Sequence, residues 1–147
     1  HISNGCHPYP PVDKNGNTSG GLNPTGSESA GCKGSGYGTQ VYGRAVKYQG
    51  VYAFMYSWYL PKDDTLTGLG HRHDWEACVV WVDDIAASSP KIVALSASAH
   101  SGYNKYCSSS YFSGSSAKID YSSSYVVINH APSATSTAGE TQPLIMW

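Results

Sequence analysis

A short stretch of the chain, Gly70-His71-Arg72-His73-Asp74-Trp75-Glu76, concentrates side chains that can bind a cation or carry a proton. Two imidazoles and two carboxylates fall within six consecutive residues, although only 13% of the whole chain is charged. A divalent cation would explain the clustering, because neighbouring carboxylates stay ionised together only beside positive charge. Carboxylate-rich ligation with one imidazole suits Ca²⁺, Mg²⁺ or Mn²⁺ better than a structural Zn²⁺, which prefers Cys and His.

The residues that follow, Ala77-Cys78-Val79-Val80-Trp81-Val82, are mostly β-branched or aromatic and predict a strand over 75–82. If that strand begins near Asp74, its alternation sends Asp74 and Glu76 to one face. Asp63 lies eight residues before His71, and the glycines of the intervening loop can fold it back over the same place. We therefore predict a metal site made of Asp63, His71, Asp74 and Glu76.

Other roles remain open for these residues. Asp74 and Glu76 can be solvated residues on an exposed strand face, and Asp63 can be a turn residue after proline. We expect His73 to hydrogen-bond a backbone carbonyl. A metal with these side chains can also activate water for hydrolysis. The chain has no Gly-x-Ser-x-Gly nucleophile motif to support catalysis, and we do not predict an enzyme.

The rest of the chain has the pattern of an all-β protein with long loops. Runs at 42–48 and 51–60 joined by Gln49-Gly50 predict a tight hairpin. Further strands are expected at 91–99, 117–121 and 124–130, and the apolar run 143–147 resembles a strand that enters the core. Many short strands favour a β-sandwich, and 147 residues fit one domain.

Cysteine content and charge indicate a secreted protein without a nucleic-acid partner. Four cysteines allow three pairings. We favour Cys6–Cys32, which brackets a Gly-, Asn-, Ser- and Pro-rich segment and would stabilise by roughly 3 kcal/mol through loop closure. Cys78 and Cys107 then form a second disulfide or stay as free thiols. A net charge of −1 gives no basic surface of the kind that binds nucleic acid. The start of the sequence without Met is expected after removal of a signal peptide.

The heptapeptide from Gly70 to Glu76 also resembles the signature of the necrosis- and ethylene-inducing-protein-like family, secreted microbial proteins of fungi, oomycetes and bacteria. Segments 4–9, 53–63, 96–103 and 134–140 are similar to other family segments, so the resemblance covers most of the chain. The family fold is a two-sheet β-sandwich with helices outside. Because family members extend further in both directions, we interpret residues 1–147 as one family domain truncated at both ends.

The resemblance implies a phytotoxin. Toxic members are cytolysins that bind the sugar head group of plant glycosylinositol phosphorylceramides and damage the plasma membrane, so action in the plant apoplast is expected. The predicted metal ligands match the family's metal-site positions, and Arg72 is expected to buttress a carboxylate or a carbonyl. Residues near the head-group pocket would be His73, His100, Asn129 and His130.

Two differences from the toxic family members, and one segment that resembles a peptide recognised by plant immune receptors, favour alternatives to lysis. Asn129 stands where family toxins often have Asp, and Tyr125 stands near an exposed loop Trp that helps membrane contact. Both changes would weaken lipid binding or lysis. The segment Ala53–Arg72 resembles the peptide that plant leucine-rich-repeat immune receptors recognise in this family. A non-lytic immune-pattern protein and a sugar-binding module with a structural ion therefore remain alternatives, and we expect a monomer.

Overall fold

The computed structural model describes residues 5–64, 70–124, 129–139 and 144–146. Its main sheet has six strands in the order β10-β1-β2-β3-β4-β5, and the pairs β6–β7 and β8–β9 form two small sheets. The elements are β1 Val41–Tyr48, β2 Val51–Asp63, β3 His71–Val82, β4 Ile92–Ala99, β5 Gly102–Tyr106, the 3-10 helix η1 Ser109–Tyr111, β6 Phe112–Ser113, β7 Ser116–Ala117, β8 Ile119–Ser124, β9 Asn129–Ala134 and β10 Leu144–Met146. This architecture confirms the all-β prediction. In the described ranges the helical content is η1, and no helix there is long and apolar enough to cross a lipid bilayer.

The hairpin of β1 and β2 is confirmed. Val41 pairs with Trp58 at one end, and Tyr48 pairs with Val51 next to the turn. Gln49 and Gly50 both have positive φ, 46° and 90°, as a two-residue turn that follows the twist of the strands requires. On its other side β1 pairs in parallel with β10, so the apolar run near residue 145 forms the expected strand.

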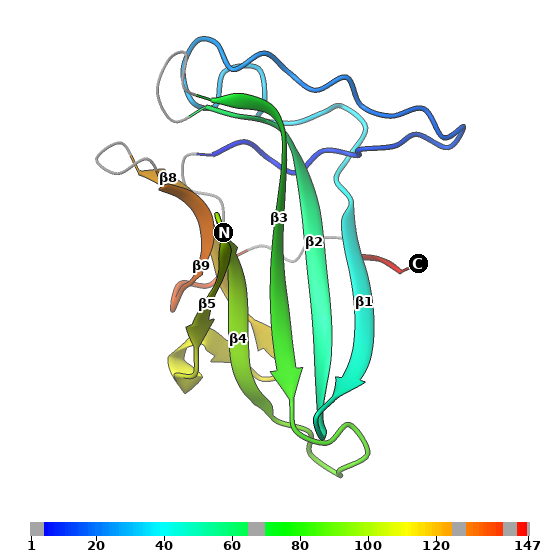
Figure 1. Cartoon of the computed structure of the whole chain (residues 1–147), viewed down its shortest axis with the longest axis vertical. Coiled ribbons are helices and arrows are strands. Elements are labelled where there is room, and N and C mark those ends of the chain that lie inside the picture. The colour runs from blue at the N-terminus through cyan, green and yellow to red at the C-terminus, as the bar shows by residue number, and fades with distance from the viewer. Residues whose placement is uncertain (1–4, 65–69, 125–128, 140–143, 147) are drawn as a thin grey trace.

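Both central strands are longer than predicted at the end that carries the candidate ligands. β2 continues through Pro61 to Asp63, although proline is normally confined to sheet edges. Because β1 starts opposite Trp58, the last residues of β2 lie beside the N-terminal segment instead, and Leu22 N–H donates to Pro61 O at 2.8 Å. Figure 1 shows this segment, in blue, crossing the ends of β2 and β3.

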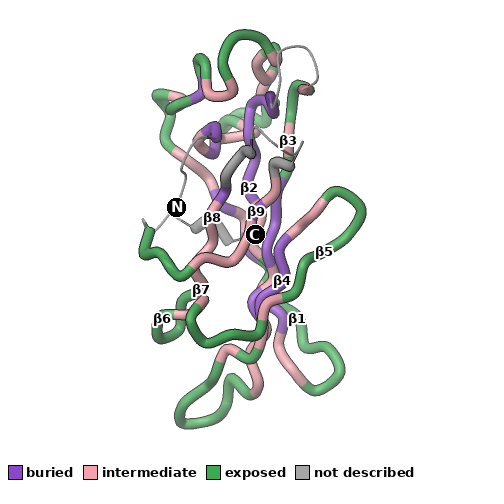
Figure 2. The backbone as a smooth tube through the Cα atoms, turned by 90° about the vertical axis from the view of Figure 1, so that its left-hand side faces the viewer, coloured by how far each residue is buried: buried purple, intermediate pink, exposed green. Residues whose placement is uncertain are grey.

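The ribbon of β8 and β9 packs against β3 and β4 and completes the core. The core residues come from both layers: Trp58, Leu60, Cys78, Val80, Leu95 and Tyr121. Buried backbone follows the middle of the main sheet and its contact with the ribbon (Figure 2). The ribbon strands lie later in the chain than the predicted 117–121 and 124–130, because pairing with a partner strand extends β8 into a serine run of low strand propensity.

The predicted disulfide Cys6–Cys32 is confirmed, and of the two alternatives for Cys78 and Cys107 the structure has the free thiols. Cys6 and Cys32 form a disulfide with a Cα–Cα distance of 5.0 Å. Cys78 and Cys107 are both free, the first buried and the second exposed. Cys78 lies on β3 and Cys107 follows β5, and β4 runs between these strands. Strands two places apart are separated by about 9–10 Å, beyond the Cα–Cα reach of a disulfide at about 7 Å.

Candidate binding site

The antiparallel pairing of β2 with β3 brings Asp63 opposite His71. These residues pair across the two strands, and Asp63 Oδ2 lies 3.7 Å from His71 Nε2. Gly70 makes the return possible, because a Cβ atom there would lie 2.0 Å from the backbone oxygen of Asp63. A side chain at Gly70 would therefore push β3 away from β2 at the residues that carry the candidate ligands.

His73 changes the direction of β3 between two candidate ligands. Its φ is 63°, in the left-handed region that non-glycine residues rarely adopt. Strict alternation would send His71 and Asp74 to opposite faces, yet both line the same hollow. His73 Nδ1 lies 2.7 Å from the Tyr59 hydroxyl, so its partner is a side chain and not the predicted backbone carbonyl. His73 therefore acts on the backbone and does not line the hollow.

Three carboxylates converge on the buried phenol of Tyr121, which reaches them from β8. Burial raises the pKa of Tyr121, and the negative charges of Asp74, Asp63 and Glu76 raise that pKa further. The phenol also forms a hydrogen bond with Asp74. Glu76 is 7% exposed, so the alternative of a solvated strand face does not apply to it. Asp63 is 4% exposed and ends β2, so it is a strand residue and not a turn residue. Three of the four predicted ligands thus share one acidic environment.

An open hollow of about 430 Å³ lies beside this acidic environment. Its lining comes from β3 and from the β4–β5 hairpin: His71, Asp74, Trp75, Glu76, Ser98, Ala99, His100, Gly102 and Tyr103. Ser98 Oγ donates a hydrogen bond to Glu76 Oε2 and accepts one from Ala77 N–H at 2.9 Å. Charged and polar groups therefore form the floor, and the half-exposed Tyr103 stands at the rim. The Trp75 ring instead packs against Tyr42 and Tyr59, with ring centroids 5.8 and 5.6 Å away.

The donor chemistry of the hollow suits a hard divalent cation. Carboxylate oxygens and one imidazole are ligands that Ca²⁺, Mg²⁺ and Mn²⁺ accept. Among the described residues, no three His, Cys, Asp or Glu side chains are gathered tightly enough to form a finished metal site. A metal site at Asp63, His71, Asp74 and Glu76 therefore stays a prediction.

The other candidate residues do not all line the hollow. His100 lines the hollow, as the resemblance implies. Arg72 points to the N-terminal segment, where it donates to Gly20 O at 3.1 Å and to the Asn23 side chain. Asn129 and His130 belong to β9, and their side chains lie outside the described residues, as does the whole of Tyr125.

Sequence reasoning missed three residues that shape the site. Ser98 and Tyr103 come from a hairpin whose segment was noted only for its family likeness, and Tyr121 comes from a ribbon more than 40 residues after the heptapeptide. The residues around them in the sequence do not have the spacing that identifies ligand residues. The register of β4 against β3, and the packing of β9, the partner strand of β8, against β3 and β4, bring these side chains to Glu76 and Asp74.

Comparisons with known proteins agree on one family. Residues 1–147 match the family described as Necrosis inducing protein (NPP1). The chain is 72% identical to the necrosis-inducing protein NPP1 of Phytophthora nicotianae, over all of this chain and 63% of that protein. The chain therefore spans less than two thirds of this relative's length.

Two solved structures share the fold. One is the crystal structure of the non-toxic HaNLP3 protein, 48% identical with a TM-score of 0.92, over 99% of this chain and 68% of the other. The second is NLPPya in complex with mannosamine, 53% identical with a TM-score of 0.88, again over 99% and 68%. The fold is thus found both in a non-toxic protein and in a protein that binds an amino sugar.

Proposed function

The chain belongs to the Necrosis inducing protein (NPP1) family, and from this premise we propose that it is a secreted phytotoxin of the plant apoplast. It binds a divalent cation and the sugar head group of plant glycosylinositol phosphorylceramide, and it damages the plasma membrane. Its action is binding and lysis and not catalysis. The observation that carries the proposal is the convergence of Asp63, Asp74 and Glu76 beside an open hollow.

The cation would be held by Asp63, His71, Asp74 and Glu76, with Ca²⁺ or Mg²⁺ as the first candidates and Mn²⁺ as the next. When bound, the cation would supply a hard acceptor for sugar hydroxyl oxygens. Two further side chains orient the carboxylates that would bind the cation. Tyr121 and Ser98 hydrogen-bond Asp74 and Glu76 and thereby fix the orientation of two carboxylates.

Sugar binding is supported by the rim of the hollow. Tyr103 lines the hollow and is 48% exposed, so an aromatic ring remains open next to polar groups. Aromatic rings with one wet edge suit a sugar, which has both an apolar C–H face and hydroxyl groups. His100 adds a hydrogen-bonding group at the same place. The mannosamine complex of the related NLPPya protein points to the same ligand class.

The test is dye release from vesicles that contain plant glycosylinositol phosphorylceramide. We expect leakage in Ca²⁺ or Mg²⁺, loss of leakage in EDTA, and loss of leakage in the Asp74→Ala variant. The control is Asp84→Ala, which removes an exposed carboxylate in the loop after β3. Since six residues of β3 separate Glu76 from the strand end at Val82, that loop is roughly 20 Å from the hollow. Leakage that persists in EDTA would contradict the cation requirement.

A second candidate function is a non-lytic role, as a sugar-binding protein or as an immune pattern. The likeness to the non-toxic HaNLP3 protein favours it. Recognition of the segment Ala53–Arg72 by a plant leucine-rich-repeat receptor requires neither the fold nor a cation. A folded protein that binds the vesicles without leakage, together with a synthetic 53–72 peptide that triggers immune responses, would support this role over the toxin.

A further inference from the structure

Lys62 is a cation buried in the interior of a protein that has few charges. Its side chain is fully enclosed at the end of β2, next to the candidate ligand Asp63. Burial removes the hydration of an ammonium group, so the group must find replacement partners. Its three N–H donors have three acceptors: Thr25 O at 3.2 Å, Ser27 O at 3.1 Å and Asp64 Oδ2 at 3.3 Å.

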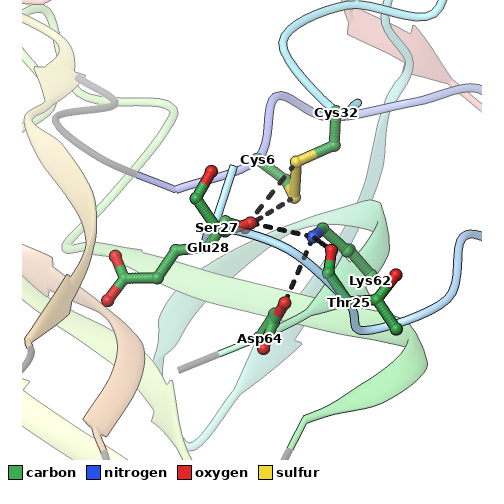
Figure 3. Close-up of polar contacts among 7 residues, drawn as sticks. All are labelled: Cys6, Thr25, Ser27, Glu28, Cys32, Lys62 and Asp64. Carbon is green, nitrogen blue, oxygen red and sulfur yellow. Dashed lines mark hydrogen bonds and ion pairs between the residues drawn. A yellow bond between two sulfur atoms is a disulfide. The ribbon is translucent and has the colours of Figure 1, made fainter. Parts of the chain in front are cut away.

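The two carbonyls belong to an irregular segment with no strand of its own. Figure 3 shows Lys62 reaching from β2 toward Thr25 and Ser27, with the Cys6–Cys32 disulfide beside them. The disulfide closes this segment covalently, and His7 N–H donates to Cys32 O at 2.9 Å. Lys62 is therefore a buried attachment of this cross-linked loop to the main sheet, beside the hydrogen bond from Leu22 N–H to Pro61 O and those from Arg72 to Gly20 O and the Asn23 side chain.

Asp63 connects the attachment at Lys62 to the residues around the hollow. Asp63 lies between Lys62 and Asp64, whose side chains form a buried ion pair at 3.3 Å. It pairs with His71 across the strands and belongs to the carboxylate cluster around Tyr121. A shift of the β2 end would change the separation of Asp63 from His71, since both are held by the last residues of the ladder.

We propose that Lys62 is a positioning residue of the hollow: it clamps the loop closed by Cys6–Cys32 onto the end of β2 and thereby fixes Asp63 beside His71. This role rests on the proposed cation site for its consequence in binding. Its structural part concerns only the chain's own residues and is measured without any cation.

The first experiment is amide hydrogen exchange on the cation-free protein and on Lys62→Met. We expect faster exchange at Leu22 and at the Asp63–His71 pair in the variant, with unchanged exchange at Val80 and Leu95 in the core. The matched control is Lys33→Met, since Lys33 is an exposed lysine that bonds Gly5 O at 3.4 Å in the same N-terminal region. Unchanged exchange at Asp63 and His71 would overturn the proposal.

The second experiment is calorimetric titration with Ca²⁺ and Mg²⁺, in which charge and position act in opposite directions. Loss of a nearby positive charge alone would tighten cation binding, whereas loss of position weakens it, by about 10- to 100-fold for residues that orient ligands. We expect weaker binding in Lys62→Met and wild-type binding in Lys33→Met. Tighter or unchanged binding in a folded Lys62→Met protein would overturn the proposal.

The Asp64→Asn variant shows whether the carbonyl contacts or the ion pair position Asp63. It removes the charge of Asp64 and keeps the hydrogen bonds from Lys62 to Thr25 O and Ser27 O. We expect its exchange at Asp63 and His71 to stay close to wild type. If wild-type protein binds neither cation, the proposed function fails. The exchange measurement on the cation-free protein still decides the role of Lys62.

Discussion

Asp63 and His71 face each other across the last rungs of the β2–β3 ladder, with Asp63 Oδ2 3.7 Å from His71 Nε2. Asp63 is almost fully buried, while the His71 side chain is 56% exposed. The pair therefore joins the acidic interior to the open hollow, and an incoming ligand would meet the imidazole first.

Cation binding should weaken as the solution becomes more acidic. A ligating imidazole must be neutral, and protons compete for it as pH falls. We expect the affinity for Ca²⁺ or Mg²⁺ to fall between about pH 7.5 and about pH 5. Calorimetric titration across this range measures it, with His71→Gln as the comparison. A flat profile in the wild type would remove His71 from the ligand set.

Gly70→Ala should destabilise the end of β3. The added methyl group would collide with the backbone of Asp63 and Asp64, which cannot move aside like a flexible side chain. We expect a loss of about 1–3 kcal/mol in the free energy of unfolding, measured by urea denaturation. Gly102→Ala is the matched control, because it has open space around its Cβ position and also borders the hollow. Equal effects of the two changes would contradict this packing argument.

His73→Gly and His73→Ala should differ in stability although both remove the contact with Tyr59. Only glycine adopts the observed φ of 63° without steric cost. We expect the glycine variant to be more stable than the alanine variant by about 1 kcal/mol, which is the reverse of their usual order in strands. Urea midpoints with matched slopes would show the difference, and an alanine variant of higher stability would argue against a left-handed backbone here.

The two free thiols should react at very different rates. Burial raises the pKa of Cys78 to about 12, so the neutral thiol predominates over the whole range in which the protein is handled. Cys107 is exposed. Because the thiolate is the reactive form, iodoacetamide at about pH 8 should label Cys107 and leave Cys78 unmodified until urea unfolds the chain. Mass spectrometry of the labelled peptides reads this directly, and rapid native labelling of Cys78 would be inconsistent with its position in the core.

Local patterns predicted much of the fold. Gln49-Gly50 specified its hairpin, and the alternation around Glu76 placed one carboxylate face inward. The extension of β2 through Pro61 was not predictable from local sequence. It depends on a distant segment, near Leu22, that lies where β1 has not yet begun.

Only part of the candidate site was predictable from the sequence, because the rest again depends on contacts between distant segments. The ligands next to each other in sequence could be recognised by their spacing, whereas Tyr121 and Ser98 reach them through packing and register. His73 was expected to bond a backbone carbonyl and to lie near the head-group pocket, but its observed role is in the backbone. Its left-handed conformation brings His71 and Asp74 to one hollow. A single left-handed residue in a strand leaves no pattern of residue types.

The parallel pairing of β10 with β1 has a consequence for the order of folding. Residues 144–146 bond to residues 41–43, so one edge of the main sheet is completed by residues about 100 positions later in the chain. During synthesis, β1 and β2 can form their hairpin early, but the edge of β1 stays open until the late strand emerges. Pairings this distant slow folding and leave an edge available for aggregation. The disulfide between Cys6 and Cys32, which needs only the first residues, can close long before that.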